Sequence, residues 1–144
     1  MKAIVLAILF VLSLPTVAAQ APEPSPDPVF EMRPIGWVRK SEERTFIEVD
    51  RRYQPALLGV ADLAAIWVLY WFDRNDTPAQ RAILQVHPRR DPSNPVHGVF
   101  ATRAPVRPNL IALSRCRVLS VRDNIIEIDA IDAFADSPVL DIKP

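Results

Sequence analysis

Residues 64–72 read AAIWVLYWF and form the most apolar stretch of the chain beyond its N-terminal segment. The stretch is rich in β-branched and aromatic side chains, which pack well on a pleated surface. It ends at DRNDTP, residues 73–78, a turn-forming sequence that limits it to the length of one strand. We therefore predict a buried central strand here, and this strand points to a β-sheet protein.

Shorter apolar segments flank this strand on both sides. Residues 34–40 (PIGWVRK) and 45–49 (TFIEV) predict two strands joined by a polar turn at 41–44. A short helical turn is expected within residues 54–63. Four more strands are predicted at residues 83–87, 99–102, 110–121 and 125–131, with a hairpin turn at Asp123-Asn124.

The turn residues also argue against long helices. The chain has only three glycines but fifteen prolines, so proline, Asn and Asp must set most of its turns. Seven short strands with little helix predict a mostly all-β fold, which can be a compact barrel or a sandwich.

The first 21 residues have the composition of a cleavable signal peptide. Lys2 precedes an unbroken apolar run over residues 3–14, which is too short to span a bilayer as a helix. Small residues at Ala19 and Ala21 offer cleavage positions. The alternatives are an uncleaved anchor and a misassigned start.

Two further regions follow the predicted signal peptide, which occupies residues 1–21. Residues 22–32 begin with prolines that alternate with small or acidic residues, which favours an extended linker. Residues 33–144 have the size of one small domain. This organisation predicts an exported protein, periplasmic or secreted, with no stable membrane insertion after cleavage. The protein is cytoplasmic if the N-terminus is not a working signal.

Charge is balanced overall but unevenly distributed. The chain has 17 basic and 17 acidic side chains, so its net charge favours no class of partner. Residues 81–122 hold eight arginines and one acid, Asp91, whereas residues 123–144 hold six acids and one lysine. The arginines indicate either a basic face or the solvent-exposed side of a sheet. The acids at positions 129, 132, 136 and 141 most simply form a solvated rim.

No motif for covalent or metal chemistry is present. Cys116 is the only cysteine, so an intramolecular disulfide is excluded, and we expect the side chain to be buried. His87 and His97 flank a loop in which no Cys or Glu completes a ligand set, so no metal site is predicted. There is also no Gly-rich phosphate loop and no Ser in a nucleophile signature. The catalytic residues are unassigned.

Residues 97–109 read HGVFATRAPVRPN and are unusual for a connecting segment. Proline fixes the backbone, while arginine and asparagine present hydrogen-bond donors. That combination suits a rigid loop that holds an anionic or polar ligand. A purely structural loop is the alternative.

Five segments, in order, resemble the TrmO or TsaA-like family. They are PIGWVRK from residue 34, IWVLYWF from 66, HPRRDPSNPVHGVFATRAPVRPN over 87–109, IALSRCRVL from 111 and SPVLDIKP from 137. The resemblance implies a single small β-barrel of the TsaA-like type over residues 33–144 that forms a homodimer. It also implies a methyltransferase that uses S-adenosylmethionine to methylate N6 of a threonylcarbamoyl-adenosine beside the tRNA anticodon.

The resemblance also implies site residues, position by position. Methyl transfer from a sulfonium depends mainly on placing donor and acceptor in line, so these are positioning residues. The implied cofactor-binding residues are Asp73, Arg74, Arg103, Leu113, Asp132, Ala133, Phe134 and Ala135. Arg107 and Asn109 are implied to shape their loop or to contact RNA phosphate.

Several family positions differ in this chain. A Pro-Arg-Gln triplet has no counterpart between Lys40 and Phe46, and alanines stand at 64–65 in place of Ser-His. Asp73 replaces His, Ala112 replaces Gly, and the pair at 135–136 is Ala-Asp where Asp-Gly is usual. Lost glycines matter because a Cβ blocks close approach and penalises positive φ. The alternative function is therefore an exported TsaA-like binding module that has lost methyltransferase activity.

Overall fold

The computed structural model of the protein describes residues 27–144. The chain divides into two units, residues 1–30 and 31–144, and the elements below belong to the second unit. The predicted signal peptide and residues 22–26 of the predicted linker lie outside the described residues. Among the described residues, no helix has the length and apolar character needed to cross a membrane.

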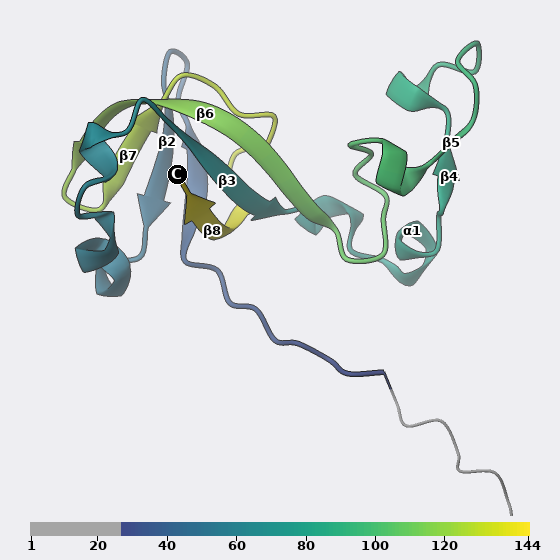
Figure 1. Cartoon of the computed structure of the whole chain (residues 1–144), viewed down its shortest axis with the longest axis horizontal. Coiled ribbons are helices and arrows are strands. Elements are labelled where there is room, and N and C mark those ends of the chain that lie inside the picture. Colours follow the sequence, from purple (N-terminus) through teal and green to yellow (C-terminus); the bar gives the residue numbers. More distant parts are fainter. Residues whose placement is uncertain (1–26) are drawn as a thin grey trace, which may run out of the picture. The chain divides into compact units, whose positions relative to one another are not determined.

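Six antiparallel strands close into a barrel in the order β1, β2, β7, β6, β3, β8, and β8 pairs with β1 to complete it (Figure 1). These strands are β1 (Gly36–Lys40), β2 (Thr45–Val49), β3 (Ala65–Trp71), β6 (Ile111–Arg122), β7 (Ile125–Ile128) and β8 (Pro138–Lys143). The prediction of a mostly all-β fold with one small barrel is confirmed, and the barrel rather than the sandwich is formed.

β3 is the strand predicted from AAIWVLYWF, and it lies inside the sheet. It pairs with β6 on one edge and with β8 on the other. Its side chains alternate, so Ile66, Val68 and Tyr70 are buried while the residues between them are half-buried. The stretch looks uniformly apolar in sequence because its outward face is also partly covered.

β6 is long because it serves two partners. Its first half pairs with β3 and its second half with β7, and the register shifts between Val118 and Ser120. The predicted hairpin turn follows, with Asp123 at φ 53°. Asn124 is buried and donates its side-chain N–H to the carbonyl of Val49 at 2.6 Å, which fastens the hairpin to the end of β2.

Gly36 begins β1 at a point where two backbones nearly touch. A Cβ at this position would lie 2.4 Å from the carbonyl oxygen of Glu48 and 2.8 Å from the Cα of Val49. Any larger residue would separate β1 from β2, so the glycine in PIGWVRK is required for barrel closure.

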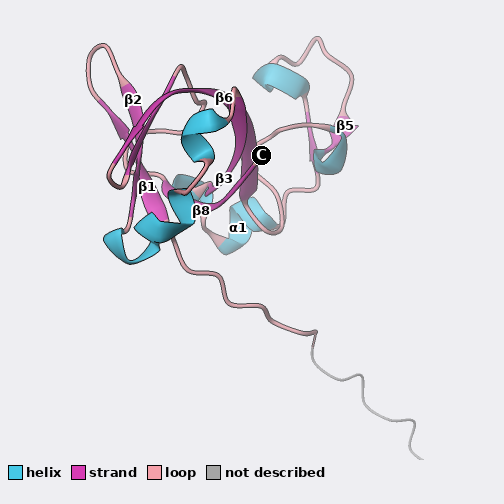
Figure 2. Ribbon diagram, turned by 60° about the vertical axis from the view of Figure 1, so that its left-hand side comes forward, coloured by secondary structure: helices cyan, strands magenta, loops and turns pink. Residues whose placement is uncertain are grey.

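A lobe formed by residues 77–110 is inserted between β3 and β6 (Figures 1 and 2). Its regular elements are all short: α1 (Pro78–Arg81), β4 (Gln85–Val86), η4 (Pro88–Arg90), β5 (His97–Gly98) and η5 (Val99–Ala101), where η denotes a 3₁₀ turn. β4 and β5 form a separate two-stranded sheet. Only Val99 and Leu110 of the lobe are buried.

The sequence-based expectations fail mainly in this lobe. The strand predicted at 83–87 shrinks to the two residues of β4, and the strand predicted at 99–102 is the 3₁₀ turn η5. Neither segment joins the barrel, because three prolines and two left-handed arginines interrupt the chain between them. The sixth barrel strand is β8, within the SPVLDIKP motif. The helical turn predicted within 54–63 is two 3₁₀ turns, η1 (Arg51–Leu57) and η2 (Val60–Asp62).

The hydrophobic core lies inside the barrel and includes Cys116. The cysteine is fully buried, as predicted, and burial raises the pKa of its thiol to about 11. It therefore behaves as a small apolar side chain at neutral pH.

Candidate functional site

A cavity of about 190 Å³ opens where β3 ends, and we call it the β3-end cavity. Asp73 and Arg74 reach it from η3 (Asp73–Asn75), the 3₁₀ turn that directly follows the strand. Residues 132–134 reach it from the loop between β7 and β8. Five of the eight residues implied by the sequence motifs are thus brought together from two distant segments.

The loop over residues 132–137 is held in place by β1. Lys40 donates its Nζ to the carbonyl of Ile131 at 2.9 Å, and the backbone N–H of Asp136 donates to the carbonyl of Val38 at 2.7 Å. Arg39 also pairs with the Asp136 carboxylate. The loop therefore presents its side chains on a fixed backbone.

Arg74 and Phe134 both line the β3-end cavity and contact each other. The guanidinium carbon of Arg74 lies 4.1 Å from the centroid of the Phe134 ring. Phe134 is nonetheless 59% exposed, so its side chain is available to stack against a flat ligand. Asp73 and Asp132 are exposed carboxylates that line the same cavity.

Tyr70 and Ser114 place polar groups beneath this region, and neither was singled out from the sequence. The Tyr70 hydroxyl lies 3.4 Å from the Ser114 Oγ, and both side chains are buried. Burial raises the pKa of Tyr70, and the hydrogen bond with Ser114 only partly opposes this rise. The sequence does contain a signal that could have identified them. Each is a polar side chain at an inward-facing position of a predicted strand, where an apolar side chain is expected.

Arg103 is a residue of the lobe that contacts β6 close to the β3-end cavity. Its Nη1 donates to the carbonyl of Leu113 at 2.9 Å. Within residues 27–144 it forms no ion pair, so the pairing with an acid that a structural role would suggest is not seen. A neighbouring cavity of about 350 Å³ is lined by Arg103, Ser114 and Asp132.

Four predicted residues lie apart from the β3-end cavity. Leu113 is exposed on β6 and meets Arg103 only through its carbonyl, and Ala135 is exposed beyond the lining residues. Arg107 shapes its loop, because its Nη2 donates to the carbonyls of Val99 at 2.8 Å and Thr102 at 3.2 Å. Asn109 is exposed at the end of the same loop.

The charged residues of β6 and the C-terminal region mostly form surface pairs. Asp129 accepts from the backbone N–H of Arg117 at 2.8 Å and from its Nε at 3.2 Å, and Asp141 pairs with Lys143. The side chain of Arg115 points outward, like that of Arg117, and alternates with the inward Ser114 and Cys116. These arginines follow the solvent-exposed pattern, and Asp132 differs from the other three acids of the predicted rim because it lines the β3-end cavity. The described residues contain no group of three or more His, Cys, Asp or Glu placed to hold a metal.

The departures from the family pattern fall in different places. Ala64 and Ala65 lie at the start of β3, a strand length of roughly 20 Å from Asp73, so they cannot border the β3-end cavity. Ala112 faces the core beside Tyr70. Asp136 has φ 66°, a left-handed conformation that favours the glycine usual at this position.

Comparison with known proteins places these features in context. The sequence of residues 31–144 matches the family model of the tRNA-methyltransferase O N-terminal domain. A protein named "Probable S-adenosyl-L-methionine-binding protein" from Methanocaldococcus jannaschii is 41% identical over 115 residues, covering 80% of this chain and 91% of its own length. The human tRNA (adenine(37)-N6)-methyltransferase is 36% identical over 91 residues, covering 63% of this chain and 20% of that protein.

A solved structure has the same fold. The crystal structure of TrmO from Pseudomonas aeruginosa superposes with a TM-score of 0.60 at 26% identity. The match covers 81% of this chain and 55% of the solved one, so this chain spans about half the length of that protein.

Proposed function

This chain belongs to the tRNA-methyltransferase O N-terminal domain family, and we propose that it binds S-adenosylmethionine at the β3-end cavity as a methyltransferase of RNA. The observation that carries the proposal is the convergence of Asp73, Arg74, Asp132 and Phe134 on one cavity. The archaeal relative, named as a probable S-adenosyl-L-methionine-binding protein, supports the choice of cofactor.

The residues present fit the chemistry of this cofactor. S-adenosylmethionine carries an ammonium and a sulfonium, which suit the carboxylates of Asp73 and Asp132, and a carboxylate, which suits a guanidinium. Its adenine is a flat ring that suits the exposed face of Phe134. The β3-end cavity is smaller than the roughly 300–1,000 Å³ usual for ligand sites. We therefore propose that the ligand extends into the neighbouring cavity that shares Asp132.

The protein's part in the reaction is placement. When bound, S-adenosylmethionine supplies an electrophilic methyl group. The residues of the loop over 132–137 and of η3 hold the ligand on backbones fixed by β1 and β3, which favours an in-line approach. The Tyr70 Oη carries a proton at neutral pH, and burial raises its pKa further, so it can donate a hydrogen bond beneath the site.

For the acceptor, we propose N6 of a modified adenosine in tRNA, the threonylcarbamoyl-adenosine that the family resemblance implies. The human relative is named a tRNA (adenine(37)-N6)-methyltransferase, which supports an adenine N6 in tRNA as the methyl acceptor. The test is methyl transfer from isotope-labelled S-adenosylmethionine to tRNA with and without the threonylcarbamoyl group. Labelling of neither RNA would contradict this acceptor.

The second candidate is a binding module that retains the ligand but not the transfer. Asp73 in place of His and the left-handed Asp136 in place of Gly favour it, because both alter the loops that border the cavity. Calorimetric binding of S-adenosylmethionine without transfer to either RNA would establish this candidate.

Phe134→Ala tests the cavity directly. Loss of the stacking face and of the contact with Arg74 should weaken S-adenosylmethionine binding by about 3- to 30-fold in calorimetry, from roughly 0.5–2 kcal/mol for such contacts. Phe100→Ala is the matched control, since Phe100 is another exposed phenylalanine and lies outside the cavity. Equal effects of both variants would remove Phe134 from the site.

Arg103→Ala separates a binding role from a structural one. Hydrogen bonds to charged groups contribute roughly 1.5–3 kcal/mol, so affinity should fall about tenfold or more. The melting temperature should barely change, because Arg103 is exposed and its bond to Leu113 is at the surface. A destabilised protein with unaltered affinity would contradict the binding role.

We also propose export of the protein and its assembly as a homodimer. Export rests on the sequence of the first 21 residues, and N-terminal sequencing of fractionated protein should find a start near Gln20 or Pro22. A chain that begins at Met1 in the cytoplasm would contradict it.

For the homodimer, the exposed Leu113 and Leu119 of β6 offer apolar surface that a second copy can cover. Analytical ultracentrifugation measures the oligomeric state, and a monomer at all concentrations would contradict the dimer.

A further inference from the structure

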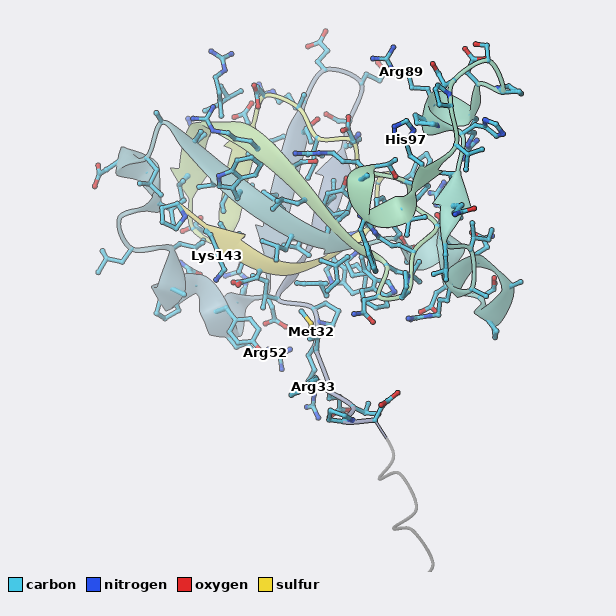
Figure 3. The ribbon with its side chains drawn as sticks, turned by 45° about the vertical axis from the view of Figure 1, so that its right-hand side comes forward. Met32, Arg33, Arg52, Arg89, His97 and Lys143 are labelled. Atoms are coloured by element: carbon cyan, nitrogen blue, oxygen red, sulfur yellow. The ribbon has the colours of Figure 1, made fainter. Side chains whose placement is uncertain are left out.

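The lobe carries a larger cavity of about 580 Å³, which we call the lobe cavity. Its lining includes three arginines, Arg89, Arg90 and Arg103, together with His87 and His97. No carboxylate lines it among the described residues. Figure 3 labels Arg89 and His97 on the lobe. A cavity of ligand-binding size with this many cationic side chains is suited to an anion.

The positive charge of the lobe cavity is not neutralised within the lobe. Asp91 is the one acid among residues 77–110, and its Oδ1 accepts from the Ser93 N–H at 2.9 Å and from the Ser93 Oγ at 2.7 Å. These hydrogen bonds lower the pKa of Asp91. Across residues 27–144, neither Arg89 nor Arg90 forms an ion pair.

The backbone is strained at these two arginines. Arg89 has φ 60° and Arg90 has φ 58°, and the left-handed conformation costs a non-glycine residue roughly 1–2 kcal/mol. The turn is held by bonds from its neighbours: the Asn94 side chain donates to the carbonyl of Pro88 at 3.0 Å, and His87 Nδ1 contacts the carbonyl of Asn94 at 2.8 Å. Such strain in a cavity-lining turn is typical of functional positions.

The lobe cavity also adjoins the candidate cofactor site. Arg90 and Pro105 line both the lobe cavity and the β3-end cavity. Arg103 lines the lobe cavity and the third cavity, which contains Ser114 and Asp132. A polyanion bound along the lobe would therefore pass beside the place where the methyl donor is proposed to bind.

We propose that the lobe cavity binds backbone phosphates of the RNA acceptor, with Arg89 and Arg90 as phosphate ligands. The choice of RNA rests on the proposed function. A guanidinium can bind two phosphate oxygens at once, and successive phosphates of one strand can engage successive arginines. The strained turn presents both guanidiniums together, so the RNA is anchored next to the methyl donor.

The experiment measures binding of a tRNA anticodon stem-loop to the full chain by fluorescence anisotropy over a range of salt concentrations. Arg89→Ala and Arg90→Ala should each weaken binding about three- to tenfold and lower the salt slope by about one. Arg122→Ala is the matched control, because Arg122 is an exposed arginine at the far end of β6 from the lobe. The RNA affinity of Arg122→Ala and the salt slope of its binding should stay close to those of the wild type.

Arg89→Gly separates binding from folding. Glycine accepts φ 60° without penalty, so this variant should unfold at the same or a higher temperature while it binds RNA as weakly as Arg89→Ala. Arg90→Lys keeps the charge but loses the two-point contact, so its affinity should lie between those of wild type and Arg90→Ala. These two results together support the proposal.

The proposal would be overturned if RNA binding were unchanged in both alanine variants, or if the wild type bound no RNA. It would also be overturned if the alanine variants lost binding to anionic lipid vesicles while their RNA binding stayed intact. Competition by inorganic phosphate at millimolar concentration as strong as that by the stem-loop would assign the site to small phosphates and also overturn it. The RNA-binding measurement needs no S-adenosylmethionine. Calorimetric titration of S-adenosylmethionine tests the cofactor proposal separately, so the two proposals can fail independently.

Discussion

The barrel and the lobe are built on different physical principles. The barrel buries a continuous apolar core inside a closed ladder of backbone hydrogen bonds. The lobe has six prolines, a two-stranded sheet of two residues per strand, and only Val99 and Leu110 buried. Local hydrogen bonds hold the lobe together. For example, Arg107 donates to the carbonyl of Val99, and Arg81 donates to the carbonyl of Pro108 at 2.6 Å.

This difference shows how the fold divides its tasks. Hydrophobic burial in the barrel supplies most of the stability, since it is the dominant favourable term in folding. The lobe is free to carry unpaired arginines and strained backbone, because little of the core depends on it. The candidate sites lie at the junction, where Arg90 and Pro105 of the lobe meet residues from the end of β3.

The sharpest test of this division truncates one isoleucine in each region. Ile126→Ala in the core should lower the free energy of unfolding by about 2–5 kcal/mol, because Ile126 is fully buried. Ile83→Ala in the lobe should cost less than about 1 kcal/mol, because Ile83 is 38% exposed. Urea denaturation of both variants measures the loss in the free energy of unfolding. Equal losses would contradict the idea that the barrel supplies most of the stability.

Alkaline pH should weaken the barrel through Cys116. Its pKa is about 11 in the folded protein against an ordinary 9.0, so between these values the unfolded chain loses a proton that the folded chain keeps. Stability should therefore be fully present below pH 9 and fall by up to about 3 kcal/mol as pH rises to 11. Cys116→Ala should flatten this slope in denaturation series, and an unchanged slope would assign it to other groups.

The attachment of the lobe should fail without unfolding the barrel. Arg81 bonds Asp76 at 2.8 Å and the carbonyl of Pro108, and it lies over the ring of Trp71 at 5.2 Å. Arg81→Ala should accelerate amide hydrogen exchange across residues 77–110 several-fold and leave exchange in β3 and β6 unchanged. Faster exchange in both regions would show that the lobe and the barrel unfold together.

The smallest effect is expected at Asp136, a left-handed residue in the loop between β7 and β8. With φ 66°, Asp136→Gly should be more stable than Asp136→Ala by about 1 kcal/mol, because both variants lose the pairing with Arg39 and only glycine accepts the conformation freely. Thermal unfolding of the two variants measures the difference. Equal melting temperatures would mean that the loop relaxes to another conformation.

Local patterns predicted the barrel strands well and the lobe poorly. AAIWVLYWF, PIGWVRK and TFIEV each form the expected strand, because burial on a pleated surface selects residues at every second position. Residues 83–87 and 99–102 have similar composition, yet they form a two-residue strand and a 3₁₀ turn. Apolar residues there serve local turns, and Leu84 and Phe100 remain exposed.

The candidate site shows the same limit. The motifs pointed to Asp73, Arg74 and the loop from Asp132, but not to Tyr70, Ser114 or Arg90. Tyr70 and Ser114 look like ordinary strand residues until β3 and β6 place their hydroxyls together. Arg90 looks like one basic residue among several until the lobe brings it to two cavities.

The sequence by itself determined five of the six barrel strands, the hairpin turn at Asp123-Asn124 and the burial of Cys116, because periodicity and turn chemistry act over a few neighbouring residues. Only the tertiary structure decided that the strands close into a barrel, that residues 77–110 leave it, and that Asp73 meets Asp132 in one cavity. Each of these depends on contacts between residues far apart in the chain, and such contacts are set by how whole strands pack together.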